Sequence, residues 1–261
     1  MTFEELKSIN FAISGWAGSG STSLALLISK MTKRKYLYIG NVFRYLGQQL
    51  GYDDKGEKRP EFDNYIEGII GKTVDDFIDH RLLSTENIIL EGDIAGFRLG
   101  RNPKIFSIFV KASYEERLRR IHIEGRPEGE KYLLERDDVL NKKYKEIWGI
   151  DFYSSELIEK KYNLVIDNST SSIQIELKEF FEALDAQYRL HEDPLFQKML
   201  SKIDKEVDLF WAKGKDYLLE YLKKQDLYYD PKEIIRDITK EFPEDIIKFP
   251  SKVQAIFLGQ K

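Results

Sequence analysis

The stretch FAISGWAGSGSTS, residues 11–23, decides the fold of this chain. A short apolar run of β-prone residues leads into Gly15, Gly18 and Gly20, and an apolar helical pattern begins directly afterwards at Leu24. A strand, a glycine-rich turn and a helix start form an arrangement that binds phosphate, because the turn points successive N–H groups inward and the helix N-terminus adds partial positive charge. The stretch therefore predicts a phosphate loop.

The same residues fit the pattern G-x-x-x-x-G-K-[ST] with one departure. Gly15, Gly20 and Thr22 match the pattern, and Ser21 stands at the lysine position. The backbone amides and the Mg²⁺-binding hydroxyl survive this change, whereas the point charge on the β- and γ-phosphates is lost. Glycine- and serine-rich turns also precede helices as plain loops, so the pattern alone leaves that alternative open.

The bulk composition excludes several classes of protein. The 261 residues suffice for one α/β domain with an appendage or for two small domains. A formal charge of −4 argues against nucleic-acid binding, and the absence of cysteine excludes disulfides, thiolate zinc sites and cysteine nucleophiles. The polar, acidic start of the chain is unlike a signal peptide, and no long apolar run follows it. We expect a cytoplasmic protein that binds neither nucleic acid nor membranes.

Five β-rich runs recur along the chain and are separated by helical patterns. They cover residues 11–13, 36–40, 87–93, 104–112 and 161–168. Strands that alternate with helices, without hairpin signals, predict a parallel sheet with right-handed crossovers. Ligands of such a sheet gather at the carboxyl ends of the strands. We expect this edge to collect the phosphate loop, residues 40–44 and residues 91–93.

Capping residues and glycines predict where several helices begin and end. Asn41 is expected to cap one helix, and a second helix over residues 62–70 is expected to break at Gly71 and to restart two residues later. A longer helical stretch opens at Ser113, with a glutamate three residues on as its capping-box partner, and runs to about residue 148.

Three charged residues at the predicted strand ends are candidates for the chemistry. Arg44 lies in the first turn of a helix, where a cation is locally unfavourable, so an anionic ligand would explain it. Glu91 and Asp93 end a buried strand, where carboxylates hold Mg²⁺ through water or orient an acceptor. The alternative for the two carboxylates is helix capping and turn chemistry around Gly92.

The helical insertion between the last two strands carries most of the candidate cations. Phosphoryl transfer needs positioned cations, because charge spreads over the transferred oxygens, and the planar fork of arginine matches phosphate. The candidates are Arg117, Arg120, Arg126, Arg136, Lys142 and Lys143. The alternative is a solvated basic face that nearby glutamates balance.

The chain resembles the cytidylate kinase family, in particular its short archaeal-type branch, in the segments GWAGSGSTS, YIGNVFR, IILEGDIAG, KKYKEIWGID and YNLVIDNS. The resemblance covers residues 9–185, with the motifs in order and at compatible separations. It implies a three-layer α/β P-loop nucleoside monophosphate kinase fold with a parallel five-stranded sheet and a helical lid. We expect the kinase domain to span residues 1–187, with the nucleotide-binding segment at about 41–84 and the lid at about 114–148, and residues 188–261 to form an α-helical C-terminal extension.

The resemblance also implies roles for individual residues, with ATP and Mg²⁺ as cofactors and nucleotides as substrates. The cofactor-binding residues are Gly15, Gly18, Ser19, Gly20, Ser21, Thr22 and Ser23, with Thr22 on Mg²⁺. The substrate-binding residues are Gly40, Arg44, Glu91, Asp93 and Arg117. The catalytic residues are Arg120, Arg136 and Lys143. Lys143 stands where the family has arginine, so it keeps the charge and lacks the bidentate fork.

Three residues depart from the family pattern. Ser21 replaces the lysine of the phosphate loop, where members of this branch often carry threonine. Asp93 replaces an arginine that faces the acceptor phosphate, which a carboxylate would repel unless Mg²⁺ intervenes or Arg98 or Arg101 swings in. Leu140 replaces an acidic residue that helps to read the base. These departures leave two questions open: whether the protein is specific for cytidine nucleotides, and whether it catalyses the transfer.

Residues 186–261 lie outside the resemblance. Apolar residues recur there at helical spacing, namely Leu195, Met199, Ile203, Val207, Phe210, Trp211, Leu218, Tyr221 and Leu222. The pattern predicts either a helical extension that packs on the core or a surface for a homodimer or another protein partner, since an amphipathic helical hairpin has to bury its stripe.

The predicted function is the ATP-dependent phosphorylation of a nucleoside monophosphate, with CMP or dCMP as the expected acceptor. One alternative is a nucleotide-binding regulator on a kinase scaffold, which the departures at Ser21, Asp93 and Leu140 motivate. The other is a kinase of a small non-nucleotide acceptor, whose hydroxyl group would account for Asp93.

Overall fold

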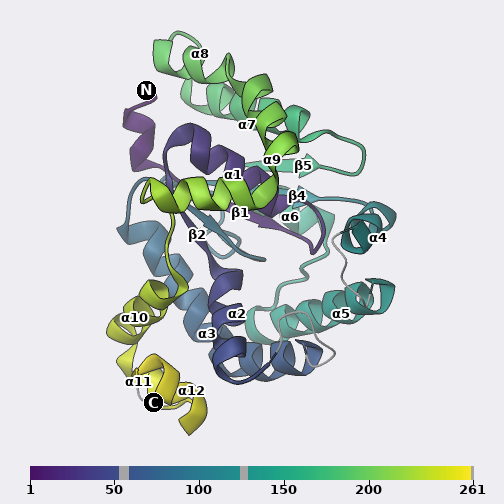
Figure 1. Cartoon of the computed structure of the whole chain (residues 1–261), viewed down its shortest axis with the longest axis vertical. Coiled ribbons are helices and arrows are strands. Elements are labelled where there is room, and N and C mark those ends of the chain that lie inside the picture. Colours follow the sequence, from purple (N-terminus) through teal and green to yellow (C-terminus); the bar gives the residue numbers. More distant parts are fainter. Residues whose placement is uncertain (53–58, 124–128, 260–261) are drawn as a thin grey trace.

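The computed structural model of the chain describes residues 1–52, 59–123 and 129–259. A parallel sheet lies between two layers of helices, and the last helices gather beside α2 and α3 (Figure 1). The strands are β1 Asn10–Gly15, β2 Lys35–Tyr38, β3 Ile88–Glu91, β4 Ile105–Lys111 and β5 Leu164–Asp167. The helices are η1 Glu5–Ser8, α1 Ser21–Thr32, α2 Ile39–Gln49, α3 Arg59–Ser84, α4 Tyr114–Ile123, α5 Gly129–Trp148, α6 Ser155–Lys161, α7 Ile173–Tyr188, α8 Pro194–Leu200, α9 Ile203–Lys224, α10 Pro231–Glu241, α11 Pro243–Ile246 and α12 Ser251–Phe257.

The five strands form one parallel sheet in the order β2-β3-β1-β4-β5, which confirms the predicted fold class. The central strand β1 is buried along its whole length, and this explains why its sequence reads as a continuous apolar run instead of alternating. The register pairs Ile13 with Glu91 and Gly15 with Val110. The loop that follows Gly15 therefore begins beside the carboxyl end of β3.

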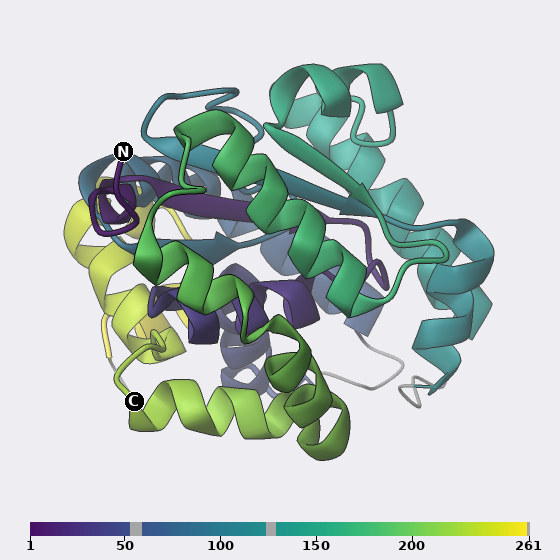
Figure 2. The ribbon, with the colours of Figure 1, turned by 90° about the horizontal axis from the view of Figure 1, so that it is seen from above.

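Helices cover both faces of the sheet. Helices α1, α7, α8 and α9 share one apolar cluster with Phe11, Ile13 and Phe106, and the green helices of this layer lie over the strands in Figure 2. Helices α2, α3, α10 and α12 share a second cluster with Leu37 and Leu90 from the other face. The loop between β1 and α1 is thus anchored by a strand and a helix that are both part of the core.

Two predicted helix boundaries are wrong. Helix α2 begins at Ile39, directly after β2, so Asn41 lies inside its first turn and does not cap it. Helix α3 runs through Gly71 without a break. A Cβ at Gly71 would lie 2.9 Å from Nζ of Lys143 on α5, which is the end of a flexible side chain. The glycine is an interior residue of α3 and not a stop signal.

The predicted lid is made of two helices, α4 and α5. As predicted, Ser113 caps the first of them, because its Oγ accepts a hydrogen bond of 3.3 Å from the Glu116 amide. The Glu116 carboxylate binds two arginines of its own helix and does not return to Ser113. Arg126 and the stretch 124–128 lie outside the described residues.

The C-terminal extension packs on the core, as one of the two readings of its apolar stripe predicts. Helix α9 lies against α1 and α7, and α10 lies against α2 and α3. Phe210, Leu218 and Leu222 of the stripe are buried, whereas Leu195 and Trp211 are exposed. The predicted boundary between residues 187 and 188 falls in the last turn of α7 and stays a prediction.

The segment between α9 and α10 covers the open edge of the sheet. The amide of Tyr36 donates to the carbonyl of Leu227 over 2.9 Å, and the amide of Tyr229 donates to the carbonyl of Tyr36 over 3.0 Å. This backbone pairing protects the edge strand β2, which would otherwise expose unpaired groups. It also brings the extension to the neighbourhood of the strand ends.

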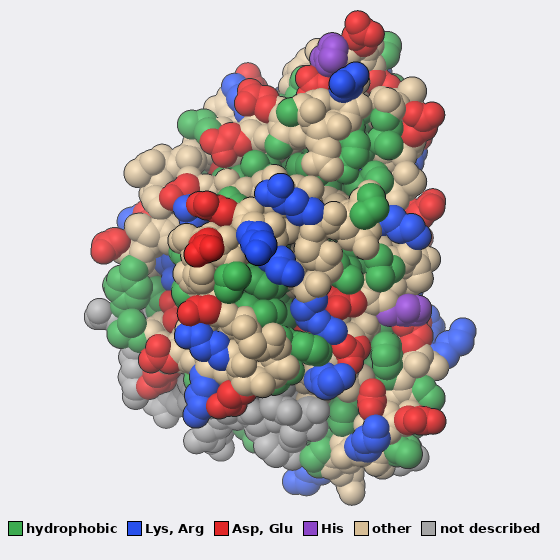
Figure 3. Space-filling model, turned by 180° about the vertical axis from the view of Figure 1, so that it is seen from behind, with side chains coloured by type: hydrophobic (Ala, Val, Ile, Leu, Met, Phe, Trp, Pro, Cys, Tyr) green, Lys and Arg blue, Asp and Glu red, His purple; other side chains and the backbone are tan. Residues whose placement is uncertain are grey.

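The surface carries charges of both signs. Acidic and basic side chains are interspersed on the face shown in Figure 3, in keeping with the small net charge of −4. Among the described residues, no helix combines the length and the hydropathy that crossing a membrane requires.

Candidate functional site

The loop between β1 and α1 has the backbone conformation of a phosphate loop. Gly18 and Gly20 have φ angles of 80° and 99°, in the left-handed region that favours glycine. Gly20 is the N-cap residue of α1 and has no side chain to cap the helix. The first amides of a helix have no partner within the helix, so those of Ser21 and Thr22 are left for a ligand.

Three side chains hold the outer side of this loop. Arg117 Nε donates to the Ala17 carbonyl over 2.7 Å. Arg120 Nη1 and Asn168 Nδ2 both donate to the Ser19 carbonyl over 2.8 Å. Since a peptide's C=O and N–H point in opposite directions, fixing these carbonyls turns the amides of the residues that follow them, Gly18 and Gly20, toward the inside of the loop. We call Arg117, Arg120 and Asn168 the loop brace.

The other predicted cofactor-binding residues lie in or directly under the loop. Ser19 is buried, and its hydroxyl packs so close to Gly15 that a Cβ there would lie 2.5 Å from it. Ser23 lies in the first turn of α1, where its amide donates to the Gly20 carbonyl over 3.0 Å. Gly15 thus allows the loop to fold over the end of β1.

Glu91 is the carboxylate nearest to the start of α1. Its Oε1 accepts hydrogen bonds from the hydroxyl groups of Thr22 over 2.6 Å and Ser21 over 3.3 Å. Its Oε2 accepts a hydrogen bond from the buried Tyr36 hydroxyl. Burial raises the pKa of the Glu91 carboxyl, and the three hydroxyl groups oppose this shift. The predicted proximity of Thr22 and Glu91 is therefore found.

Thr22 and Glu91 have the donor chemistry that Mg²⁺ prefers. The described residues contain no group of three or more acidic or histidine side chains that would bind a metal without a substrate. Mg²⁺ usually binds one or two protein oxygens together with phosphate oxygens and water. A hydroxyl and a carboxylate that are 2.6 Å apart at a phosphate loop fit this requirement.

Arg44 projects from α2 and is fixed by two neighbours. Its Nη1 donates to Asn41 Oδ1 over 3.0 Å, and its Nη2 donates to the Tyr38 hydroxyl over 3.2 Å. Gly40 lies under the Tyr38 ring, and a Cβ at this position would lie 2.5 Å from the ring. The predicted site residue Gly40 therefore makes room for the phenol that orients Arg44.

Four charged groups surround the Tyr38 phenol. They are Arg44, Glu91, Asp93 and Arg136. Burial raises the pKa of Tyr38, Arg44 opposes the shift, and the two carboxylates add to it. The structure thus brings four of the predicted site residues to one place at the strand ends, and we call them the acceptor cluster.

Helix α5 is connected to the core by two consecutive residues. Arg136 Nη2 lies 3.3 Å from Asp93 Oδ2. Asp137 accepts two hydrogen bonds from Arg117 Nη2, at 2.6 and 2.8 Å. Arg117 therefore links the loop and α5, and α5 is held over the end of β3.

The arginines expected to offset the charge of Asp93 have other partners. Arg98 pairs with Asp76 at 2.7 Å and Asp79 at 3.2 Å on α3. Arg101 donates to the carbonyls of residues 159 and 162. Among the described ion pairs, Asp93 pairs with Arg136.

Two further predicted residues of α5 contact neither the acceptor cluster nor a loop carbonyl in the hydrogen bonds described. The ammonium of Lys143 lies against Gly71 on α3 and 5.3 Å from the centre of the Tyr144 ring. Leu140 is buried in an apolar cluster with Tyr144 and Phe152. The predicted roles of Arg117, Arg120 and Lys143 toward a substrate stay predictions.

The sequence reasoning missed several residues that shape the site. Tyr38, Asn168 and Asp137 each contact a predicted site residue, and Tyr228 contacts Asn41, which in turn accepts a hydrogen bond from Arg44. Each of the four lies in a different segment. Tyr38 and Asn168 follow the strand-end rule that identified Glu91, and the rule could have found them. Nothing in the sequence pattern marks Asp137 or Tyr228.

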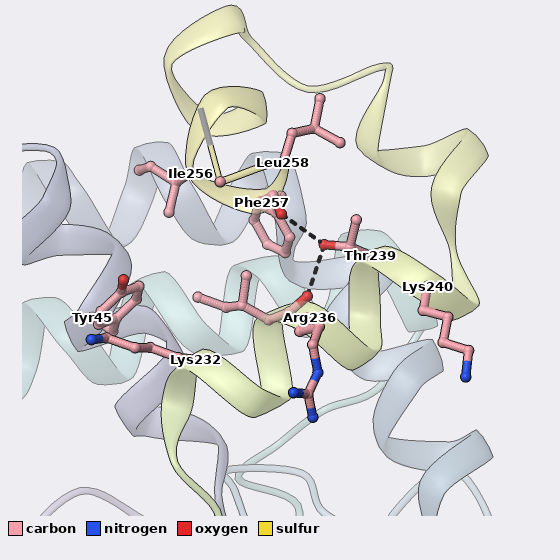
Figure 4. Close-up of a pocket in the computed structure, with 10 residues that line it drawn as sticks. Tyr45, Lys232, Arg236, Thr239, Lys240, Ile256, Phe257 and Leu258 are labelled. Carbon is pink, nitrogen blue, oxygen red and sulfur yellow. Dashed lines mark hydrogen bonds between the residues drawn. The ribbon is translucent and has the colours of Figure 1, made fainter. Parts of the chain in front are cut away.

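A separate hollow of about 520 Å³ lies between α2, α10 and the end of the chain. Figure 4 shows Tyr45 beside Lys232 at this hollow, and Thr239 bonded to the carbonyl of Phe257. None of the predicted site residues lines it. The phosphate loop and this hollow are therefore distinct features.

Comparisons with known proteins identify the family. A family model described as an AAA domain matches residues 12–149. The cytidylate kinase of Methanocaldococcus jannaschii is 30% identical over 171 residues, which cover 62% of this chain and 89% of that protein. The cytidylate kinase of Pyrobaculum islandicum is 31% identical over 170 residues, which cover 62% of this chain and 85% of that protein. A solved shikimate kinase from Acinetobacter baumannii, in complex with shikimate, has a TM-score of 0.46 at 13% identity and covers 71% of this chain and 98% of that one.

The matched stretch contains the phosphate loop, the acceptor cluster and helices α4 and α5. It extends over more than half of the chain, and the relatives are matched over most of their own length. The chain belongs to the archaeal-type cytidylate kinase family of P-loop kinases.

Proposed function

We propose that this P-loop kinase transfers the γ-phosphoryl group of ATP to the phosphate of a nucleoside monophosphate, with CMP or dCMP as the acceptor. Membership of the family implies ATP binding. The observation that supports the proposal most directly is the position of Arg44. Its half-buried guanidinium is held by Asn41 and Tyr38 at the carboxyl-end edge of the sheet, the edge from which the phosphate loop also begins. A fixed arginine of this kind suits an anionic acceptor.

The donor side of the proposal relies on backbone amides. The loop brace orients the amides of Gly18 and Gly20, and the first turn of α1 adds its own. In this proposal, several backbone N–H groups bind the phosphates of ATP in place of the lysine side chain that the pattern has at the position of Ser21. Thr22 would hold Mg²⁺, and Glu91 would orient one of its waters; the ion, when bound, neutralises charge on the phosphates.

The acceptor side relies on arginine. Two of the five N–H donors of Arg44 are used by Asn41 and Tyr38, and the others suit phosphate oxygens. No strong base is needed, because an acceptor phosphate is already anionic. Arg136 of α5, whose guanidinium lies 3.3 Å from Asp93, would move from Asp93 to the transferred group as the lid closes.

Asp93 favours a second candidate function, the phosphorylation of a hydroxyl group on a small acceptor. A carboxylate in the acceptor cluster would accept the proton of an attacking hydroxyl, as a general base does. In the first proposal Asp93 only competes with the acceptor phosphate for Arg136. The two candidates therefore assign opposite effects to the same side chain.

An assay of acceptor use tests the first proposal. The protein is incubated with ATP, Mg²⁺ and each of CMP, dCMP, UMP, AMP and GMP, and ADP release is measured. We expect turnover of a cytidine nucleotide above about 1 s⁻¹, the lower end of ordinary enzyme rates. Binding of ATP without turnover of these or of small hydroxyl acceptors would leave the regulator as the function.

Arg44→Ala is expected to raise the KM for the acceptor about thirtyfold, because a charge-assisted phosphate contact is worth roughly 2 kcal/mol. The KM for ATP is expected to stay within a factor of about two. The matched control is Arg236→Ala, which removes an exposed arginine from α10. Equal acceptor KM values for Arg44→Ala and the unchanged protein would remove Arg44 from the site.

Asp93→Asn separates the two candidate functions. If the acceptor is a phosphate, removing the competing carboxylate lowers the acceptor KM about fivefold, the effect of roughly 1 kcal/mol from one nearby charge. If the acceptor is a hydroxyl group, the same change lowers kcat by about a hundredfold, because the base is lost. Asp76→Asn, which also loses an ion pair with an arginine, is the control.

A further inference from the structure

We infer that Tyr228 of the C-terminal extension is a positioning residue for the acceptor site and acts on Arg44 through Asn41. The role of Arg44 rests on the proposed function, whereas the contacts between the three residues do not. Tyr228 lies outside residues 12–149, the stretch that the family model matches. The extension thus contributes a residue that the matched part of the chain lacks.

The three residues form a continuous chain of hydrogen bonds. Asn41 Nδ2 donates to the Tyr228 hydroxyl over 2.6 Å, and Asn41 Oδ1 accepts from Arg44 Nη1 over 3.0 Å. A carboxamide has one acceptor oxygen and one donor nitrogen. Arg44, which can only donate, sets the oxygen of the carboxamide toward itself, and the Tyr228 hydroxyl holds the nitrogen at the other end in place.

Tyr228 is itself held in place by the sheet. The residues on either side of it, Leu227 and Tyr229, pair with the backbone of Tyr36 on β2. The rings of Tyr228 and Tyr36 are 6.2 Å apart, and the Tyr36 hydroxyl donates to Glu91. The Tyr228 hydroxyl is therefore fixed relative to both the acceptor cluster and the end of β3.

The position of Arg44 depends on this chain because α2 alone does not determine it. Arg44 and Asn41 lie on one face of the first turns of α2, where long side chains have several rotamers. Tyr38 binds one terminal nitrogen of the guanidinium, Nη2, and Asn41 binds the other terminal nitrogen, Nη1. Without the contact to Tyr228 the Asn41 carboxamide is anchored only by Arg44 itself and no longer restrains it, so the Tyr38 hydroxyl is left as the one restraint of the two.

Tyr228→Phe tests the inference, because it removes the hydroxyl and keeps the ring and the backbone pairing. In the full-length protein we expect the KM for the acceptor nucleotide to rise about fivefold, as for the loss of one hydrogen bond. We expect kcat and the KM for ATP to stay within about twofold. Tyr229→Phe is the matched control, because the Tyr229 ring lies 4.4 Å from the Lys35 ammonium and not at Asn41.

A double-mutant cycle distinguishes positioning from general stabilisation. If Tyr228 acts through Asn41, then Tyr228→Phe has no further effect on the acceptor KM once Asn41→Ala is present. A role in stability alone would give additive changes in melting temperature and no change in the acceptor KM. Additive effects on the KM would overturn the inference.

A measurement without substrate keeps the inference separate from the proposed function. The side-chain ¹H–¹⁵N resonances of Asn41 and Arg44 are assigned by substitution and recorded by NMR for each variant. We expect Tyr228→Phe to shift both resonances and Tyr229→Phe to shift neither. Unmoved Arg44 resonances would overturn the inference even in an active kinase. Shifted resonances in a protein that phosphorylates no nucleotide would support the contacts and contradict the proposed function.

Discussion

Gly20→Ala is expected to weaken the binding of Mg²⁺–ATP by at least about a hundredfold. A Cβ at this position would lie 2.6 Å from Nδ2 of Asn168 and 3.2 Å from Nη1 of Arg120, the two groups that hold the Ser19 carbonyl. The φ angle of 99° adds backbone strain for any residue with a side chain. Strain of roughly 1 kcal/mol and the loss of about two hydrogen bonds together amount to roughly 3 kcal/mol.

The measurement is a calorimetric titration with Mg²⁺–ATP, with Gly214→Ala as the control. Gly214 also has a positive φ, 77°, but no atom lies within 4 Å of the position a Cβ would take. Gly214 has a ψ of −179°, a conformation that is essentially restricted to glycine, so this control carries at least as much backbone strain without the collision. It is expected to lower stability by roughly 1–3 kcal/mol and to leave ATP affinity unchanged. ATP affinity in Gly20→Ala within threefold of the parent protein would show that the amides of this loop do not bind the nucleotide.

The features that could be predicted from the sequence are those with a local cause. The apolar run before Gly15 and the glycines after it determine a strand and a turn within a dozen residues. Most of the crossovers that make the sheet parallel contain helices, and the exception is the connection from β3 to β4, which has none. Glu91 could be identified as a candidate because the carboxyl end of a buried strand is a position that sequence patterns reveal.

The features that could not be predicted depend on contacts between distant segments. Arg117 and Arg120 were recognised as cations on one helix face, but the carbonyls of Ala17 and Ser19 that they bind lie about a hundred residues earlier. Helical spacing shows which residues share a face and does not show what the face contacts. The same limit applies to Gly71, whose local signal is a helix break and whose actual neighbour is Lys143 on another helix.

Glu176→Gln is expected to remove much of the pH dependence of the protein's stability between about pH 5 and pH 9. Glu176 lies on α7 and is 1% exposed. Burial raises the pKa of its carboxyl to about 8, an effect that Arg120 opposes and Glu179 reinforces. Below the unfolded value of 4.5 the carboxyl is neutral in both states and costs nothing. As the pH rises from there toward 8, the folded state holds a proton that the unfolded state has released, so the free energy of unfolding falls.

The size of the effect follows from the difference between the two pKa values, which is about 3.5 and corresponds to at most roughly 5 kcal/mol. Urea unfolding at several pH values measures it, and Glu182→Gln, an exposed carboxylate on the same helix, is the control. Asp79 and Glu91 also have raised pKa values, so the parent protein's profile contains their contributions as well. The difference between the parent and Glu176→Gln isolates the buried carboxyl, because a neutral amide of the same shape replaces it without titrating. If the free energies of unfolding of the two proteins changed with pH in parallel, Glu176 would already be ionised at pH 5. Arg120 would then offset the cost of burying the carboxylate in full, although its guanidinium is also bonded to the phosphate loop.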